Sequence, residues 1–437
     1  MHKYYNQLLL VLFLMMATGM TFAQRRTFSP YSRYGIGELA KPGMARNMAM
    51  GGTGIALQSS SYLNSLNPAS YSAMDTMSLY FEAGVSAFSQ NLKSAVGSTN
   101  QSNSNFDYFA IGLPISKRVK SSLGMQPYAF TGYNIKNTQS TGDISTSLGS
   151  GNLSKVYLGL SVAPFKNFSL GAHASYLFGK QQHTNYFTSL IDPQALSYGI
   201  IRDTHISDIT FDFGAQYLYD INQKHRLTFG VVFSPKASLN GDMKELKARG
   251  ISFNENTSSF DEQYAIDTIN YKQQDFNGNE LQIPLSYGAG VAYHFDNKIM
   301  VTADFQLSQW AEVNMPAYAL STDAAKTVSL ENSSRISFGA EYMPDDRLAT
   351  SYFSRLRYRV GTYQYRDYIS YNGKKIDEIG LSVGVGFPMK RDKSSVNLSF
   401  VWGKKGSTQD NMIRESFARF TLDITMFEYW FIKRKFD

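Results

Sequence analysis

The sequence predicts an all-β fold, a transmembrane antiparallel β-barrel of about 14 strands around an N-terminal hatch (plug) segment. Three observations predict it. Apolar and polar residues alternate with a period of two in many segments after Met77, the pattern of a sheet whose two faces meet different surroundings. Short polar connections alternate with long ones. No stretch after the N-terminal leader approaches the roughly 20 apolar residues that a spanning helix requires.

Residues 1–23 have the pattern of a secretory signal peptide. Lys3 precedes an apolar run from Leu8 to Ala17, and Thr21-Phe22-Ala23 places small residues at the expected cleavage site. The chain contains no cysteine. Export without disulfides in a chain of 437 residues favours a Gram-negative periplasm or outer membrane, and the barrel pattern then predicts the bacterial cell outer membrane.

The composition supports a barrel and argues against a nucleic-acid partner. Aromatic residues make up 14% of the chain and charged residues only 18%, which is typical of membrane strands with aromatic girdles. The net charge of +7 is spread over turns and tails and forms no basic patch. We therefore expect contact with outer-membrane lipid and lipopolysaccharide, and no nucleic acid.

Residues 24–76 are predicted to form the hatch inside the barrel. The stretch from Met44 to Asp75 is rich in small residues and too irregular to be a lipid-facing strand, and it carries no charge between Asn47 and Met74. Gly51, Gly52 and Gly54 allow backbone conformations that β-branched residues avoid. Asn67-Pro68 marks a turn. Such a segment folds only against something that surrounds it.

Residues 77–437 are predicted to form the barrel. In one strand Val156, Leu158 and Leu160 share a face. In the last predicted strand, Phe417 to Phe431, Phe420 and Leu422 point to lipid, whereas Thr421 and Asp423 point inward. Because the number of strands is even, both termini of the chain are expected on the periplasmic side. Within the long connection 240–279, the run 243–247 has the composition of a short surface helix.

A soluble sandwich with one wet face is the alternative to a barrel, because alternation alone fits both folds. The connections favour the barrel. Short turns near residues 116–121, 164–167, 220–226, 296–298, 344–350 and 390–394 separate longer loops near 91–103, 137–152, 181–207, 240–279, 314–330, 367–375 and 404–412. Outer-membrane barrels have short periplasmic turns and long extracellular loops.

A hatch that carries Asn67-Pro68-Ala69, followed by about 14 strands, resembles the FadL family of outer-membrane transporters for long-chain fatty acids and other hydrophobic molecules. The opening from Phe28 to Gly37 (FSPYSRYGIG) also resembles relatives whose substrates are unassigned. PorV-like members of this family are partners of a protein-secretion machine, so the fold alone does not fix the function.

The resemblance implies a lateral opening in the third strand, Ser121 to Lys136. This strand contains Gly124, Pro127 and Gly132. Proline cannot donate to a sheet ladder and belongs at an edge or a bulge, and a closed barrel has no edge. These three residues are the candidate for a lateral gate. The alternative is that Pro127 lies near a rim or only bends the strand.

Charged residues are predicted to lie inside the barrel. Arg355, Arg357 and Arg359 alternate with apolar residues, so the pattern puts three guanidinium groups roughly 7 Å apart on the lumen face of one strand. Asp212, Asp304, Glu341 and Asp423 are the predicted partners. Two interpretations remain open, namely an ion network that positions the hatch or an arginine that binds a ligand carboxylate.

An enzymatic function is not expected. His173 and Ser175 share one face at strand spacing, but no third residue that would orient them is identifiable. The other histidines show no metal-ligand spacing, and Gly51-Gly52-Thr53-Gly54 lacks the lysine of a phosphate-binding loop. We expect no catalytic residue, no metal and no cofactor.

Two functions from different classes fit these features. The first is passive transport of hydrophobic small molecules such as long-chain fatty acids, by capture among the loops, rearrangement of the hatch and lateral release. The alternative is a non-transporting barrel that acts as a partner subunit or scaffold in an outer-membrane protein secretion or assembly complex. An apolar pocket lined by the loops would favour transport. A sealed lumen with bound protein partners would favour the partner subunit or scaffold.

Overall fold

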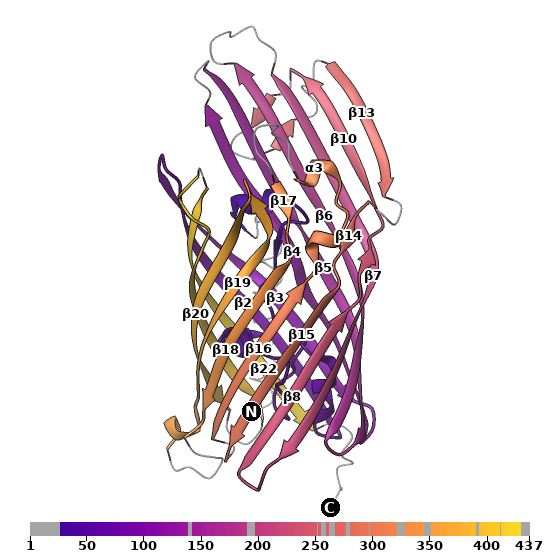
Figure 1. The fold of residues 1–437 in the computed structure, drawn as a ribbon, viewed down its shortest axis with the longest axis vertical. Helices are drawn as coiled ribbons and strands as arrows, with labels where there is room; N and C mark the ends of the chain where they lie inside the picture. The colour runs from indigo at the N-terminus through magenta and orange to yellow at the C-terminus, as the bar shows by residue number, and fades with distance from the viewer. Residues whose placement is uncertain are drawn as a thin grey trace, which may run out of the picture.

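The computed structural model describes residues 27–138, 142–189, 197–250, 252–254, 259–261, 267–276, 280–296, 298–320, 328–344, 351–389, 393–410 and 412–429. The predicted signal peptide therefore lies outside the described residues. The described chain forms a closed antiparallel barrel of 14 strands, as predicted (Figure 1). The wall strands are β2 (Ser78–Lys93), β3 (Ser98–Pro114), β4 (Val119–Thr138), β5 (Asp143–Phe165), β6 (Phe168–Ser189), β7 (Tyr198–Asp220), β8 (His225–Ser234), β15 (Ser286–Phe295), β16 (Ile299–Ser308), β18 (Ser333–Tyr342), β19 (Arg357–Tyr371), β20 (Lys374–Pro388), β21 (Ser395–Lys405) and β22 (Arg414–Tyr429).

The first and last wall strands close the barrel. β2 pairs with β22 in one continuous register, from Ser78 opposite Tyr429 to Lys93 opposite Arg414. Closure leaves no edge in the wall there, which a sheet in hydrocarbon requires. The predicted alternation is confirmed in β22, where Phe420 is 44% exposed on the outer face and Thr421, Asp423 and Thr425 are fully buried inside.

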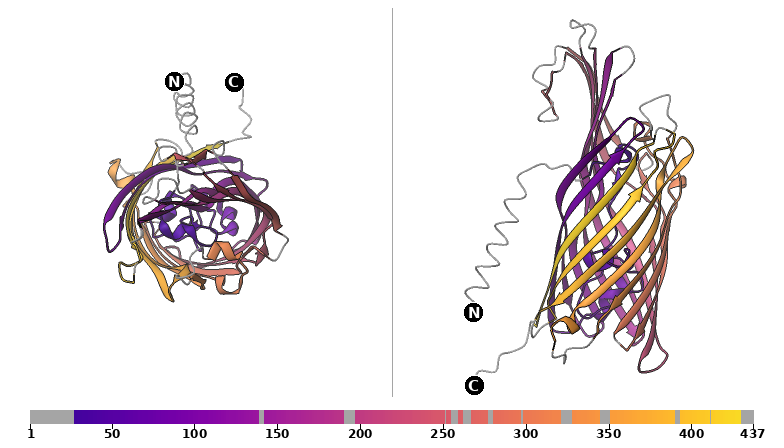
Figure 2. Two further views of the ribbon diagram at one scale, coloured as in Figure 1. Left: turned by 90° about the horizontal axis from the view of Figure 1, so that it is seen from above. Right: turned by 90° about the vertical axis from the view of Figure 1, so that its left-hand side faces the viewer.

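Several strands continue well beyond the wall at the end opposite the short turns, which we call the extracellular end. The upper half of β7 leaves β8 and pairs with β10 (Gly241–Arg249), which pairs in turn with β13 (Asp267–Phe276). Together with β5 and β6 they form an extension above the barrel, the extracellular sheet (Figures 1 and 2).

The predicted long loops are therefore shorter than expected, and one predicted element is wrong. Residues 243–247 lie within strand β10 and form no surface helix. Pairing with both β7 and β13 satisfies the backbone of this segment, and such tertiary pairing outweighs the helix propensity of a short polar run. Much of the predicted connections 137–152 and 181–207 is likewise strand, because β5, β6 and β7 extend into them.

Residues 44–75 lie inside the lower half of the barrel, and we call them the plug (Figure 2). The plug contains the short helix α2 (Ala45–Met48) and the 3-10 helix η3 (Pro68–Ala73). Residues 27–41, which we call the strap, lie above it and contain the 3-10 helix η2 (Pro30–Arg33) and the two-residue strand β1 (Glu38–Leu39). In the part of the chain that is described, no helix is long and apolar enough to cross a membrane.

Short elements and aromatic side chains fill the extracellular half of the lumen. Trp310 and Tyr368 are buried and stacked, with ring centroids 4.3 Å apart, and Tyr31, Tyr34 and Ile36 of the strap belong to the same apolar cluster. The short elements at this level are β9 (Ala237–Ser238), β14 (Gln282–Ile283), η5 (Trp310–Glu312), α3 (Ala317–Leu320) and β17 (Val328–Leu330), while the pair β11 (Ser252–Asn254) and β12 (Ser259–Asp261) forms a separate hairpin.

Candidate functional site: the plug, the strap and the wall around them

Glycines on the inner face of the wall let the plug come into direct contact with the strand backbones. A Cβ atom on Gly230 would lie 2.1 Å from the carbonyl oxygen of Ile55, and one on Gly171 would lie 2.4 Å from the nitrogen of Ala69. Such distances are far below van der Waals contact. Glycine alone does not identify such contacts, because Gly84 lies against Tyr108 and Gly380 against Tyr363, which are side chains of the wall itself.

The Asn67-Pro68-Ala69 motif fixes the plug to the wall near β5, β7 and β8. Asn67 is fully buried, and its Oδ1 accepts a hydrogen bond from the Ala69 nitrogen at 3.0 Å, which caps η3. Its Nδ2 donates to the carbonyl of Ile55 at 2.7 Å and to that of Val231 in the wall at 3.3 Å. The hydroxyl of Ser161 donates to the carbonyl of Ala69. The asparagine thus joins two parts of the plug to each other and to the barrel.

Farther around the wall, carboxylates of β16 and β18 bind the plug. Asp304 accepts hydrogen bonds from the backbone nitrogens of Gly54 and Ile55 at 2.6 and 2.9 Å. Glu341 lies between Arg46 of the plug, at 3.1 Å, and Arg359 of β19, at 2.6 Å. A buried carboxylate held by two guanidinium groups is costly to separate from them, because each charge would be left uncompensated.

The structure brings together only part of the predicted lumen charge network. Arg355 lies in the 3-10 helix η6 (Phe353–Arg355) before β19, so it does not continue the strand alternation. Arg357 is half-buried, with its guanidinium carbon 5.0 Å from the centre of the Tyr62 ring. Asp212 lies 3.5 Å from Lys155, on the other side of the barrel. Asp423 accepts hydrogen bonds from Asn397 and Tyr108.

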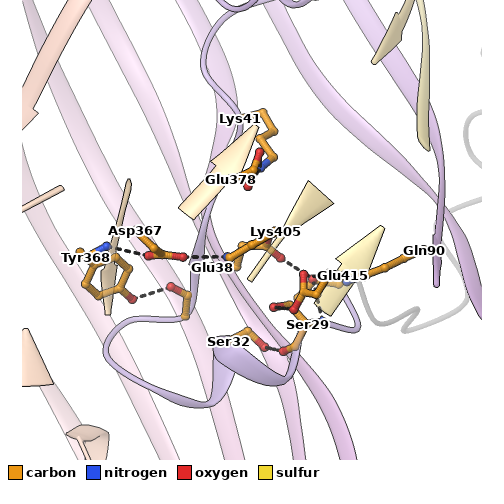
Figure 3. A network of polar contacts seen from close by, with 12 residues as sticks. Ser29, Ser32, Glu38, Lys41, Gln90, Asp367, Tyr368, Glu378, Lys405 and Glu415 are labelled. Carbon is orange, nitrogen blue, oxygen red and sulfur yellow. Dashed lines mark hydrogen bonds and ion pairs between the residues drawn. The ribbon is translucent and has the colours of Figure 1, made fainter. Parts of the chain in front are cut away.

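A second buried network holds the strap (Figure 3). Lys405 is 2% exposed and pairs with Asp367 at 2.7 Å and with Glu38 of the strap at 3.7 Å. Lys41 pairs with the buried Glu378. Ser29 donates to Glu415, which also accepts from Gln90. These wall residues were not predicted from the sequence, because the alternation shows that they face inward but not which partner they meet.

The strap lies along β4 where β3 leaves it. Pairing between β3 and β4 runs from Pro114 opposite Lys120 only to Phe109 opposite Met125. Above that point β1 takes the free side of β4, with Glu38 opposite Phe130 and Leu39 opposite Ala129.

The three residues of the predicted lateral gate lie on both sides of the point where the pairing between β3 and β4 ends. Gly124 is still paired with Ala110 of β3. Pro127 lies at a register shift in the pairing with β5, which is the irregularity expected of a proline inside a sheet. Gly132 exchanges hydrogen bonds with the Ser32 hydroxyl, and a Cβ atom there would lie 2.0 Å from the carbonyl oxygen of Thr27.

His173 and Ser175 point into the barrel, but the histidine contacts the plug. Its Nε2 lies 2.9 Å from the hydroxyl of Tyr71, and its ring centroid is 4.7 Å from that of Tyr157. Both side chains are buried. Within the described ranges, no group of three or more His, Asp or Glu residues could hold a metal ion.

Comparisons with known proteins bear on this arrangement. Three similar solved structures are the CymD monoaromatic hydrocarbon channel (14% identity over 88% of this chain and 97% of that one, TM-score 0.56), the Ralstonia pickettii toluene transporter TbuX (14%, 88% and 98%, 0.56) and a Pseudomonas aeruginosa FadL homologue (10%, 90% and 100%, 0.55). At such identities the likeness concerns the fold, which is that of FadL-type outer-membrane barrels. No curated protein matches the sequence. A family model described as BamG matches residues 4–437, and the chain therefore belongs to the BamG family.

Proposed function

We propose that this protein is a sealed, non-transporting barrel that acts as a partner subunit or scaffold in an outer-membrane protein secretion or assembly complex. One observation carries the proposal, namely that the chain's own residues occupy both routes that a ligand would take. The plug fills the lower lumen, and the strap lies along β4 where the wall divides.

The plug is attached around the barrel. Besides the Asn67 and Glu341 contacts, Gly51 donates to the hydroxyl of Ser382 in β20, and its carbonyl accepts from Arg335 in β18. On the other side, Leu63 donates to the buried Glu82 of β2. Moving the plug would break charge-assisted hydrogen bonds on opposite walls together, each worth roughly 1.5–3 kcal/mol.

The strap, like the plug, is attached to the wall by several contacts. Its attachments include a strand pairing, the Lys405 and Glu378 ion pairs, and hydrogen bonds from Gln181 to the carbonyl of Ile36 and from Tyr368 to that of Gly37. Aromatic residues of the apolar cluster cover it. This packing is that of a structural element, and a gate would need weaker contacts.

The extracellular sheet offers a surface for a partner. Strands β5, β6 and β7 have 23, 22 and 23 residues, whereas about 9–11 suffice to cross a membrane. Among the described strands, β13 pairs only with β10, so one of its edges is open to another chain. Tyr271 of β13 is 57% exposed.

The test is purification of the native protein from outer membranes in mild detergent, followed by mass spectrometry of the bound proteins and lipids. We expect protein partners at a fixed ratio. A variant in which a short turn replaces residues 241–276 should lose a partner bound to the extracellular sheet and keep a closed barrel, as judged by heat-dependent electrophoretic mobility. A protein that purifies alone with an apolar molecule in its lumen would contradict the proposal.

Transport of hydrophobic compounds is the second candidate, and the end of β3–β4 pairing at Met125 favours it. In that case Gly124, Pro127 and Gly132 border a lateral gate, and the strap is the part that moves. The solved structures with this fold include a toluene transporter, which suggests an apolar substrate. Uptake of labelled toluene or oleate into cells that make this protein, compared with cells that lack it, tests the candidate. Equal uptake would count against transport.

A further inference from the structure

A cavity opens at the periplasmic end, between the plug and strands β16, β18 and β19. Its volume is about 380 Å³, within the range of small-ligand sites. The lining includes Arg46, Arg357, His294, Lys298, Glu341 and the plug loop 58–61. The wall residues that line it lie at or near the ends of β15, β16, β18 and β19 beside the short connections, at the end of the barrel opposite the extracellular sheet.

The lining carries an excess of positive charge. Glu341 is the one carboxylate among the described lining residues, and Arg46 and Arg359 already neutralise it. Arg357 has no ion pair with any described residue, and its guanidinium instead lies over the ring of Tyr62. Arg46 and Arg359 lie near the same ring, at 4.9 and 5.4 Å. Three guanidinium groups therefore lie around one aromatic ring, and Glu341 pairs with two of them.

A second observation points to a missing acceptor. The Nε2 atom of Gln58, in the cavity lining, is buried and donates to no described residue. A buried donor without an acceptor is costly and calls for an explanation. A ligand with acceptor oxygens would satisfy both this amide and the Arg357 guanidinium.

The rim of the cavity is held in place. Lys393 donates to the carbonyl and the hydroxyl of Ser60, at 3.2 and 3.0 Å, and it also pairs with Asp75. The Ser61 nitrogen donates to the hydroxyl of Ser59. The loop is therefore preorganised, which reduces the entropy cost of binding.

We propose that this cavity binds a carboxylate side chain of an acidic peptide segment on the periplasmic side. The planar guanidinium of Arg357 matches a carboxylate in a bidentate geometry, and the Gln58 amide supplies a further donor. We assign the carboxylate to a peptide because a subunit of a protein complex binds other proteins, so this assignment rests on the proposed function. The Arg357 guanidinium is not a member of the Arg46–Glu341 and Arg359–Glu341 ion pairs that hold the plug, although Arg46 and Glu341 also line the cavity.

The experiment measures binding of a capped tetraglutamate peptide to the full-length protein in detergent, by isothermal titration calorimetry. A capped tetraglutamine peptide and inorganic phosphate are the comparison ligands. We expect tetraglutamate to bind and tetraglutamine not to bind. Arg357→Gln should weaken binding about tenfold or more, because it removes a charge-assisted pair. Arg118→Gln, in an exposed periplasmic turn outside the cavity, should leave binding unchanged.

Gln58→Leu is the second variant, and it should also weaken binding while the ion pairs stay intact. No binding of tetraglutamate, or binding that neither variant weakens, would overturn the proposal. Phosphate binding with the same dependence on Arg357 would identify a general anion site and overturn the peptide assignment. Protein partners are measured separately. If they copurify while tetraglutamate fails to bind, the proposed function stands and the cavity assignment falls.

Discussion

At the scale of single residues, Asn67 shows how a polar side chain can determine the seating of a whole segment. Its amide has one acceptor and one donor group, and both are used inside the barrel, at 3.0 Å to the Ala69 nitrogen and 2.7 Å to the Ile55 carbonyl. No other side chain of similar size supplies both roles with this geometry. The sequence identified the motif, but not the wall carbonyl that it meets.

Asn67→Asp should therefore destabilise the plug. The substitution places a carboxylate oxygen against the carbonyl of Ile55, in a fully buried position, and removes a donor. We expect a loss of about 3 kcal/mol, from repulsion and an unsatisfied buried group. The measurements are the midpoint of thermal unfolding and the rate of proteolysis within residues 44–75. Asn91→Asp, on an exposed hairpin, is the matched control, and equal behaviour of the two variants would contradict the role assigned to Asn67.

At the scale of elements, the sequence predicted the strands of the wall well, but it did not predict that β3 separates from β4. The alternation in β22 depends on local contrast between lipid and lumen, which each strand experiences by itself. The separation of β3 from β4 involves β1, which lies about 90 residues earlier in the chain than its partner residues in β4. A local sequence pattern cannot predict such a pairing. The strand β10 was missed for a related reason, since polar residues on both faces erase the period of two outside the membrane.

Gly132→Ala should release the strap from β4. The added Cβ would lie 2.0 Å from the Thr27 carbonyl oxygen, and we expect the strap to shift rather than β4, because β4 is also paired with β5 along its length. We expect faster hydrogen exchange in residues 27–41 and unchanged exchange in β5. Gly97→Ala is the control, because nothing lies within 4 Å of its added Cβ. Unchanged exchange in the strap would show that the contact is not tight.

Release of the strap also separates the two candidate functions. If the wall division is a gate, Gly132→Ala should raise uptake of toluene or oleate. If the strap is structural, the same variant should lose stability without gaining uptake, because the plug still closes the lumen below it. Raised uptake would thus support transport, and unchanged uptake with lower stability would support the scaffold proposal.

At the scale of the whole molecule, the barrel and the plug form one structure. A barrel of 14 strands is wide enough that wall side chains alone would leave its centre open, since about 8 strands are already just filled by side chains and porins of about 16–18 strands leave an aqueous channel. Some buried polar side chains of this wall are satisfied by the plug backbone, as with Asp304 and Glu82, whereas others, such as Asp423, bind wall side chains. Part of the polarity of the lumen therefore serves to hold the plug.

This reasoning predicts the electrical behaviour of the protein. In planar lipid bilayers the intact protein should show no steady conductance, because the plug contacts the wall on all sides. Deletion of residues 27–75, which removes the strap and the plug together, should give a measurable conductance, since water then enters the lumen and solvates Asp304, Arg335 and the other lumen charges. Heat-dependent electrophoretic mobility checks that the deleted form is still a closed barrel. A steady conductance in the intact protein would show that the plug leaves a path, and the sealed-subunit proposal would then be wrong.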